Sequence, residues 1–425
     1  MRPRINLSAL IQRLLTSEQG ATAVIFAIMM PVIIGGLALG AETGYWFMIK
    51  NTLQNAADVS AHSVGVRMRQ GDQLADLRQA ATRIAVSSGF HPDLGELQVN
   101  IPPLTGDYRG SREHAEVVLT ERYERLFSAI FSKTPVEIST RAVVTIKGGT
   151  PLCVLALSGD GRNAFQVAPL VDVTLEGCGA ASNSSSNSSI SSVLYSGRLF
   201  AKCVQTSGGF YMINVLGFTA CGANLTAAAP VSDPYRNFDE IDSTNLPCSN
   251  PPSSKQNGEA ERSTGRIVID GTPVMRFCAD VEIKGRYNFA PGIYVIDGGN
   301  FRIAPGATVT GEEVSFFIRR GGAVNISAAI VILSAPTSGP HRGVLFSNNR
   351  NDNEVAHRIS LMNGSVLSGV IYLPTSSLTF SGGRNSHCLQ IVASTIQFTG
   401  STWANANCAN GSRSLMAGQT VALVE

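Results

Sequence analysis

The chain has 425 residues, a formal net charge of +2 and a charged fraction of only 15%, against roughly 25% in typical globular domains. This near-zero charge excludes the dense basic face of a nucleic-acid-binding protein, so we expect no nucleic-acid partner. A hydrophobic fraction of 44% excludes wholesale disorder. The length predicts two or three domains, and the low charge together with 42 glycines favours extended β-structure over solvent-coated helices.

The first predicted element is a transmembrane helix over residues 20–41. No charged residue occurs from residue 19 to residue 41, and a helix of about 20 apolar residues crosses the hydrocarbon core of a bilayer. Bilayer helices also tolerate proline and glycine. The residues that define this anchor are Gly20, Ile25, Phe26, Pro31, Gly35 and Gly36. The alternative is a cleaved signal peptide with Ala38-Leu39-Gly40 as its cleavage site, although a signal h-region has only about 7–15 residues.

The residues that flank this span predict its orientation. Residues 1–19 form a short tail with Arg2, Arg4 and Arg13, which favours a cytoplasmic N-terminus. Tyr45 and Trp46 follow the span and are typical of the opposite membrane interface. Since no second span of this quality follows, we expect a single-pass protein of the bacterial inner membrane, with its C-terminal bulk in the periplasm or otherwise extracytoplasmic.

All cysteines lie beyond residue 150, which agrees with an exported region. An even number of cysteines in such a region predicts disulfides, but eight cysteines allow 105 pairings, so the connectivity stays open. Pairing of sequence neighbours, such as Cys388 with Cys408, is one candidate. The set is Cys153, Cys178, Cys203, Cys221, Cys248, Cys278, Cys388 and Cys408. We expect no metal site, because there is no CxxC pair and the six histidines are scattered.

Beyond the span, apolar residues at helical spacing predict a protruding amphipathic helix over residues 42–71. Its expected packing positions are Leu53, Ala56, Ala57 and Asp58. Together with the span, this helix would dock laterally with other membrane subunits, because small residues allow close approach.

The order of basic tail, glycine, apolar span and protruding helix resembles type IV pilins and pseudopilins. It resembles more closely the TadG-like N-terminal domain of Tad/Flp pilus assembly proteins, through residues 18–27 (EQGATAVIFA), Pro31 and residues 53–58 (LQNAAD). The resemblance implies partners in the lipid bilayer and among other pilus-assembly membrane proteins or pseudopilins. Processed pilins of this kind carry Glu five residues after the cleavage glycine, where this chain has Ile25, so we expect a stationary anchor rather than a filament subunit.

Residues 72–150 are predicted to form a small α+β module. Alternating apolar residues predict strands at residues 97–101, 115–119 and 136–146. Apolar residues at helical spacing, including Leu126, Phe127, Ile130 and Phe131, predict a helix over residues 122–132.

Residues 151–425 are predicted to be all-β, as short apolar runs separated by Gly, Ser, Asn and Thr. We favour a right-handed parallel β-helix, with a β-sandwich as the alternative, because short strands with turn signals are typical of both. The tract at residues 182–192 forms either polar ladders on stacked turns or a flexible loop. Residues 229–265, rich in Pro and charge, are expected to be an exposed insertion.

No motif in the chain carries recognisable chemistry. The metal-site motif of von Willebrand A domains, which many TadG-like proteins contain, lacks its leading Asp near residues 154–161. The acidic cluster Asp233, Asp239, Glu240 and Asp242 matches no calcium loop and is interpreted as a solvated loop. We expect no catalytic residue and no cofactor, and the sequence identifies no small-molecule ligand. The prediction is therefore a non-enzymatic component of Tad/Flp pilus assembly or tight adherence; the alternative is a surface-anchored β-helix adhesin or carbohydrate-active enzyme.

Overall fold

The computed structural model describes residues 18–69, 72–192, 197–211, 214–215, 219–222, 225–236, 238, 244–251, 267–269, 271–382, 388–405 and 415–425. The chain divides into two compact units. Unit 1 comprises Met1–Met68, Asp72–Ile146 and Val421–Glu425, and unit 2 comprises Arg69–Gly71 and Lys147–Thr420. A long apolar helix at the N-terminus and a mostly β region after it agree with the expected fold class.

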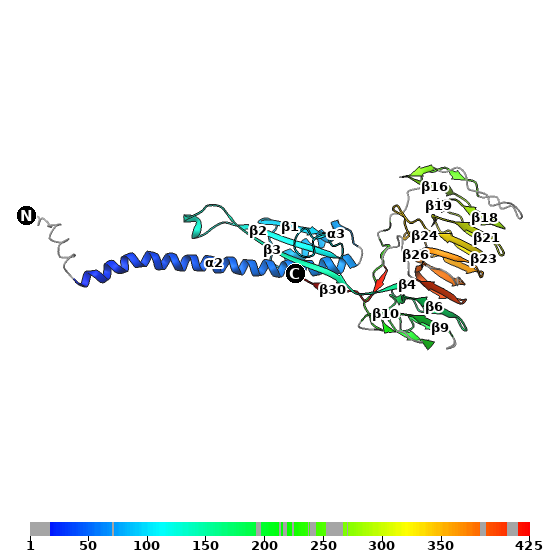
Figure 1. The fold of residues 1–425 in the computed structure, drawn as a ribbon, viewed down its shortest axis with the longest axis horizontal. Helices are drawn as coiled ribbons and strands as arrows, with labels where there is room; N and C mark the ends of the chain where they lie inside the picture. Colours follow the sequence, from blue (N-terminus) through cyan, green and yellow to red (C-terminus); the bar gives the residue numbers. More distant parts are fainter. Residues whose placement is uncertain are drawn as a thin grey trace, which may run out of the picture. The chain divides into compact units, whose positions relative to one another are not determined.

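Unit 1 is built on one long helix (Figure 1). Helix α2 (Glu18–Arg69) runs without a break for 52 residues, with Pro31 inside it. The apolar segment therefore continues without interruption into the helical residues that follow it. A second helix, α3 (Leu74–Ser87), is amphipathic and buries Leu77, Ala80, Ala81 and Ala85, as its apolar spacing requires.

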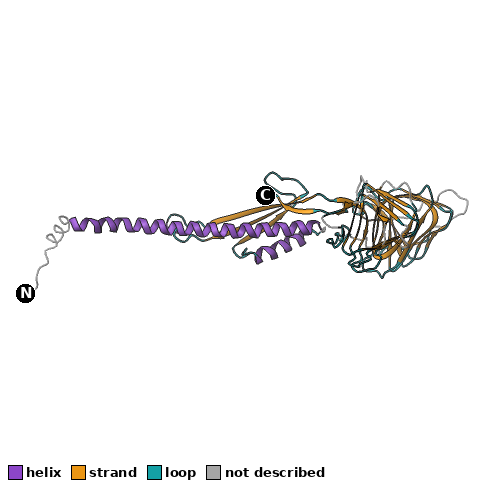
Figure 2. Cartoon of the chain, turned by 90° about the horizontal axis from the view of Figure 1, so that it is seen from below, coloured by secondary structure: helices purple, strands orange, loops and turns teal. Residues whose placement is uncertain are grey.

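The sheet of unit 1 has the order β1-β2-β3-β30. Its strands are β1 (Gly95–Asn100), β2 (His114–Tyr123), β3 (Val136–Lys147) and β30 (Thr420–Leu423). The β1–β2 and β2–β3 pairs are antiparallel. Side chains of α2 and α3 and of the facing strands form one buried cluster, and Figure 2 shows both helices along one side of the strands. The unit is thus a helical layer on an antiparallel sheet.

Two features of unit 1 differ from the sequence prediction. The expected helix over residues 122–132 is wrong: β2 extends to Tyr123, and only a single 3-10 turn, η1 (Ser128–Ile130), follows. The apolar side chains there are exposed rather than packed. A helix in this segment would therefore gain no stabilisation from tertiary packing. The end of the chain also returns to unit 1 as β30, although nothing in the sequence pattern indicated that this strand pairs outside the β-rich region.

Unit 2 is built mainly from parallel ladders of short strands. The first ladder contains, in stacking order, β14 (Cys248–Ser249), β16 (Thr272–Phe277), β19 (Gly292–Asp297), β22 (Val314–Arg319), β24 (Val344–Asn348), β26 (Val366–Ser381), β27 (Cys388–Phe398), β4 (Thr150–Ala156), β7 (Gly179–Ser182), β10 (Cys203–Thr206) and β13 (Thr219–Ala220).

A second parallel ladder contains β17 (Val281–Ile283), β20 (Phe301–Ile303), β23 (Val324–Ser334), β25 (Ala356–Leu361), β26, β27, β5 (Phe165–Val167), β8 (Ile190–Ser192) and β11 (Phe210–Tyr211). A third parallel set is formed by β18 (Arg286–Phe289), β21 (Thr308–Gly311), β23 and β26, and a separate parallel sheet by β28 (Thr402–Asn405), β6 (Asp172–Glu176), β9 (Arg198–Ala201) and β12 (Asn214–Val215). The antiparallel additions are β15 (Ile267–Ile269) beside β16 and β29 (Met416–Ala417) beside β4.

The chain enters and leaves this stack in its middle. β4, the first strand of unit 2, pairs with β27, which comes more than 230 residues later. From β4 the chain builds strands toward β13, and after residue 248 it builds from β14 back to β27. In Figure 1 the colours run from yellow to orange down the stack and return to green where β27 meets β4. The strands from β14 to β27, which come later in the sequence, therefore stack on one side of β4, and the earlier strands β7, β10 and β13 stack on its other side.

Both faces of the first ladder are buried over much of its length. On one face, Tyr294, Phe316 and Phe346 lie in register and stack with ring centroids 5.4 Å and 5.2 Å apart. The opposite face lies in further apolar clusters with Phe317, Val344 and Val370. Burial on two faces explains why these strands are continuous apolar runs without polar alternation.

Part of the second face is covered by a crossing segment that we call the strap, residues 228–247. Its described residues are 228–236, 238 and 244–247. Val231 and Tyr235 are buried, so the described part of the expected insertion 229–265 is not simply an exposed loop. The strap has to cross the ladder because β13 and β14, which it connects, lie at opposite ends of the stack.

Three disulfides each join a strand of the first ladder to a residue that directly precedes or follows the neighbouring strand. The bonds are Cys153–Cys178, Cys203–Cys221 and Cys248–Cys278, with Cα atoms 5.7 Å, 4.8 Å and 5.5 Å apart. Disulfide formation is thus confirmed for six of the eight predicted cysteines, and each bond joins cysteines adjacent in the sequence. Cys388 is also disulfide-bonded, and Cys408 lies outside the described residues.

Candidate functional site

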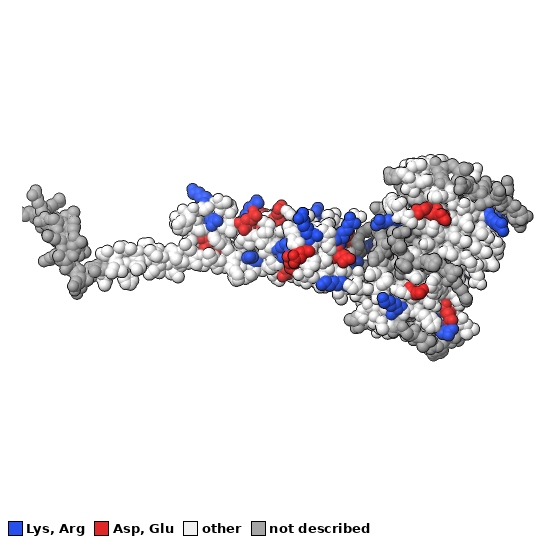
Figure 3. Space-filling model, in the orientation of Figure 1, with Lys and Arg blue, Asp and Glu red and all other residues white. Residues whose placement is uncertain are grey.

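The candidate site is the anchor formed by α2 and the parts of unit 1 packed around it. The N-terminal half of this helix is exposed: every large apolar side chain described between Val24 and Leu37 is at least half accessible. Figure 3 shows no charged side chain on this bare stretch of helix, in contrast to the charged surface of the sheet region. An exposed helix without charge is stable where lipid rather than water surrounds it.

The predicted anchor residues lie along this stretch. Gly20, Ile25, Phe26 and Pro31 all belong to α2, and the side chains of Ile25 and Phe26 point outward. Open space surrounds Gly35 and Gly36, where an added Cβ would meet no atom within 4 Å. Among the described residues, the anchor therefore presents an exposed apolar surface at Ile25, Phe26, Gly35 and Gly36.

The end of this stretch is marked by a buried carboxylate. Glu42, only 2% exposed, accepts hydrogen bonds from the backbone N–H groups of Leu126 and Ser128 at 2.8 Å and 2.7 Å. The Ser128 hydroxyl donates a third bond at 3.0 Å. These three bonds fix the loop between β2 and β3 to the helix directly after the predicted span.

The aromatic residues expected at the membrane interface lie one turn further along. Tyr45 makes an edge-on contact with Tyr123, with ring centroids 6.5 Å apart. The guanidinium of Arg125 lies 5.6 Å from the centre of the Trp46 ring, within reach of a cation–π attraction. Tyr45 is thus exposed and contacts the end of β2, whereas Trp46 is partly buried against the unit 1 core and contacts the start of the same loop.

The second half of α2 packs within its own chain. Leu53, Ala56 and Ala57 are fully buried against α3 and the sheet. Asp58 is half-buried and accepts a hydrogen bond from Gln54 at 2.8 Å. Leu53, Ala56 and Ala57, which were expected to help dock other subunits, are covered by α3 and this chain's own sheet, so these three residues are not open to lateral contact.

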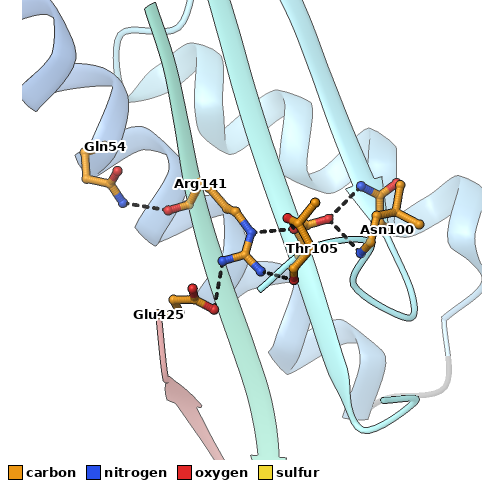
Figure 4. A network of polar contacts seen from close by, with 7 residues as sticks. Gln54, Asn100, Thr105, Arg141 and Glu425 are labelled. Atoms are coloured by element: carbon orange, nitrogen blue, oxygen red, sulfur yellow. Dashed lines mark hydrogen bonds and ion pairs between the residues drawn. The ribbon is translucent and has the colours of Figure 1, made fainter. Parts of the chain in front are cut away.

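A polar network ties this helical half to the sheet (Figure 4). The Glu116 carboxylate on β2, 1% exposed, forms an ion pair with Arg141 on β3. It also accepts hydrogen bonds from Asn100 and from Thr105 at 2.9 Å each. The Gln54 amide of α2 donates to the backbone carbonyl of Arg141 at 3.0 Å.

The same guanidinium reaches two further groups. Arg141 Nη2 donates to the carbonyl of Thr105 at 2.7 Å, and Nη1 lies 2.8 Å from Oε2 of Glu425. Burial by itself raises the pKa of Glu116, but the hydrogen bonds from Arg141, Asn100, Leu104 and Thr105 outweigh it and lower the pKa to about 2. The network therefore holds a charged, buried carboxylate between β1, β2 and β3, and Arg141 links it to the chain end at Glu425.

In the part of the chain that the structure describes, no group of three or more His, Cys, Asp or Glu side chains could hold a metal ion. Of the acidic cluster at residues 233–242, Asp233 is described, and it pairs with Arg350 and accepts a hydrogen bond from the Tyr372 hydroxyl at 2.9 Å. Asp239, Glu240 and Asp242 lie outside the described residues.

These features define the class of the protein. Among the described residues, one helix is long and apolar enough to cross a membrane. No residue of its most apolar stretch is buried within the protein. The chain is thus organised as a single-pass, membrane-anchored protein.

The comparison with protein families agrees with this class and identifies a related family. Residues 20–62 match the family model described as TadE-like protein. A TadE-like domain on an apolar helix fits an anchor of the Tad pilus, which confirms the resemblance of the N-terminal segment to Tad/Flp pilus proteins. No curated protein and no solved structure matches this chain.

Sequence reasoning missed two parts of this site. The hydrogen bonds between Glu42 and the β2–β3 loop were missed because a charged residue directly after an uncharged run does not indicate a buried partner. The loop that binds Glu42 lies within residues 122–132, whose apolar spacing predicts a helix that the structure does not contain. Glu116 and Arg141 were also missed, although a charged residue within an apolar strand such as 115–119 is a usable signal of a buried ion pair.

Proposed function

We propose that this protein is a non-enzymatic, membrane-anchored component of Tad/Flp pilus assembly that acts through protein–protein contacts in the cell envelope. The observation that carries the proposal is the TadE-like match over residues 20–62. It coincides with a helix whose large apolar side chains from Val24 to Leu37 are exposed among the described residues and whose second half packs on a sheet. In such an arrangement the span is free to contact lipid and other membrane subunits, and unit 1 holds the part of α2 that follows the span.

We place the N-terminus in the cytoplasm and units 1 and 2 on the periplasmic side of the inner membrane. The basic residues before the span favour this orientation. The three described disulfides support it as well, because disulfides persist in oxidising compartments.

Unit 2 is proposed to be a right-handed parallel β-helix that serves as a rigid scaffold or contact surface. The parallel pairing of successive strands in ladders supports this fold over a β-sandwich, whose strands would pair antiparallel. Aromatic stacking along the ladder and disulfides between neighbouring strands stiffen such a stack.

Deletion of the gene tests the role directly. We expect loss of surface pili and of cell aggregation, with restoration by the full chain. The proposal fails if piliation survives the deletion. If, in addition, the purified periplasmic region cleaves or tightly binds a polysaccharide, the protein is instead a surface-anchored adhesin or carbohydrate-active enzyme.

A variant of the span tests whether the protein needs its membrane anchor when units 1 and 2 are intact. Ile33 and Ile34 are exposed on the bare helix, and each lysine placed at the centre of a span costs about 2.5–3.5 kcal/mol of insertion free energy. We expect I33K/I34K to move the protein out of the membrane fraction and to abolish complementation. The matched I33L/I34L variant should behave as wild type, and equal piliation with both variants would contradict the need for an anchor.

A further inference from the structure

Among the described residues of unit 1 outside α2, the loop between β2 and β3 carries the most exposed apolar side chains. Ile130 is 88% exposed and Phe131 is 79% exposed, and Leu126 and Phe127 are more than half exposed. We call residues 126–131 the apolar loop. Exposed clusters of this kind mark contact surfaces, because water disfavours them.

The apolar loop is held at one level of the helix. Its amides at Leu126 and Ser128 bind Glu42, the first charged residue after the span. Arg125, directly before the loop, contacts the Trp46 ring. Figure 1 shows the β2–β3 connection at the end of the sheet nearest the bare half of α2. The loop therefore lies where the span leaves the hydrocarbon core.

The apolar surface of α2 continues past this level. Phe47 and Met48 are exposed like the side chains of the span, so the apolar helical surface from Val24 to Met48 is about 37 Å long at about 1.5 Å per residue. That length exceeds the roughly 30 Å of a hydrocarbon core and reaches into the interfacial layer. The apolar loop is continuous with this surface at the level of Glu42.

The hydrogen bonds that the loop makes to Glu42 lower the free-energy cost of placing this carboxylate near hydrocarbon. A free carboxylate is costly near hydrocarbon, but three hydrogen bonds from the loop satisfy Glu42 and cover it. On the other side of the loop, Lys133 is exposed and can extend its ammonium to lipid headgroups.

We propose that the apolar loop inserts into the outer interfacial layer of the bilayer beside the span, as a second membrane contact that fixes the tilt and rotation of unit 1. The occupant of this surface is lipid rather than a protein partner, because the loop is joined to the surface that the span already presents to lipid. This inference rests on the membrane anchoring of the proposed function and not on the role in pilus assembly.

The test uses the full chain in vesicles of phosphatidylethanolamine and phosphatidylglycerol. A genetically encoded fluorescent amino acid at position 131, or at position 130 as a second site, leaves the disulfides intact. The matched control is position 104: Leu104 is 59% exposed, and it precedes β2, whereas the apolar loop follows β2. The positive control is position 33 in the span.

Nitroxide-labelled lipids, with the label at a shallow acyl-chain carbon, report the depth of each site. We expect quenching at positions 130 and 131 to exceed that at 104 by at least about twofold, since interfacial segments insert about 5–10 Å. Strong quenching at 33 with equal quenching at 131 and 104 would overturn the loop contact alone. Absence of quenching at 33 would overturn the anchor and the loop contact together.

Discussion

Glu116 and Arg141 show how unit 1 tolerates a charge in its interior. The carboxylate of Glu116 is buried, yet Asn100, Thr105 and Leu104 supply donors in addition to the guanidinium. Breaking a buried ion pair by removing one partner typically costs about 3–5 kcal/mol, because the other charge is left without compensation. The network is therefore a point at which a single neutral substitution weakens the attachment of β1, β2 and β3 to one another.

The substitution Glu116→Gln is expected to destabilise unit 1 by about 3 kcal/mol at neutral pH. The pKa of Glu116 is about 2 in the folded protein, below its unfolded value of about 4.3. This contribution to the free energy of unfolding is therefore fully present above pH 4.3 and is lost as the pH falls toward 2. Hydrogen exchange of β2 and β3 amides, measured from pH 6 downward, should show the two proteins converging at acidic pH.

A second carboxylate on a neighbouring strand serves as the control. Glu137 pairs with Arg122, but both side chains are more than half exposed, and exposed pairs contribute only about 0–1 kcal/mol. Glu137→Gln should leave exchange in β2 and β3 nearly unchanged. A pH-independent difference between Glu116→Gln and wild type would contradict the assignment of the charge to Glu116.

At the scale of elements, the strap shows what holds the outer face of the first ladder. Asn183 and the backbone of Val231 exchange two hydrogen bonds of 2.7 Å and 2.8 Å. Further along, the ring of Tyr235 lies 5.3 Å from that of Tyr372, and the carbonyls of Thr244 and Leu246 accept bonds from Arg276 at 2.9 Å each. The strap thus makes contacts from β7 to β16, nearly the length of the ladder.

Tyr235→Ala is expected to lower the free energy of unfolding of unit 2 by about 3–5 kcal/mol, as for other large buried aromatic residues. Tyr235 is 1% exposed and packs on the ladder in the cluster with Leu155 and Val370. Native-state hydrogen exchange of the β24 and β26 amides should report the loss. Tyr211→Ala, at a half-exposed site in β11, should change stability by less than about 0.5 kcal/mol. Similar effects of the two substitutions would show that the strap does not stabilise the ladder.

Particular residues show how far the sequence predicts these elements. The runs at 292–297 and 314–318 lie within β19 and β22 because two-sided burial leaves a continuous apolar signal. The helical spacing at 122–132 was misleading because periodicity reports a possible apolar face and does not say whether any surface covers it. The pairing of β4 with β27 was beyond sequence reasoning, because strand patterns do not encode which distant strand completes a ladder.

For the whole molecule, the chain connectivity makes unit 2 an insertion into a β-hairpin of unit 1. Thr420 donates its hydroxyl to the carbonyl of Lys147 at 3.3 Å, and the N–H of Val424 donates to the carbonyl of Val143 at 2.9 Å. The strands β3 and β30 therefore run in opposite directions, and the chain departs for unit 2 and returns from it at facing residues. This connectivity requires unit 2 to begin and end near one place, which its entry and exit in the middle of the stack satisfy.

The insertion predicts that unit 1 folds without unit 2. If residues 148–419 are replaced by Asn-Gly, a two-residue turn suited to antiparallel strands, β3 and β30 should still pair. Val421 should still pack in the unit 1 core. We expect the shortened protein, in detergent, to keep the slow hydrogen exchange of β2 and β3 amides.

The opposite truncation should be more damaging although it is far smaller. Removing Val421–Glu425 takes away the ion pair of Glu425 with Arg141, the hydrogen bonds of Val143 and the packing of Val421. About 1 kcal/mol for each of the two hydrogen bonds of Val143 and about 1 kcal/mol for the partly buried Val421 predict a loss of about 3 kcal/mol and faster exchange in β3. If five residues can be lost without effect while excision of unit 2 unfolds the sheet, unit 1 depends on unit 2 and not on the returning strand.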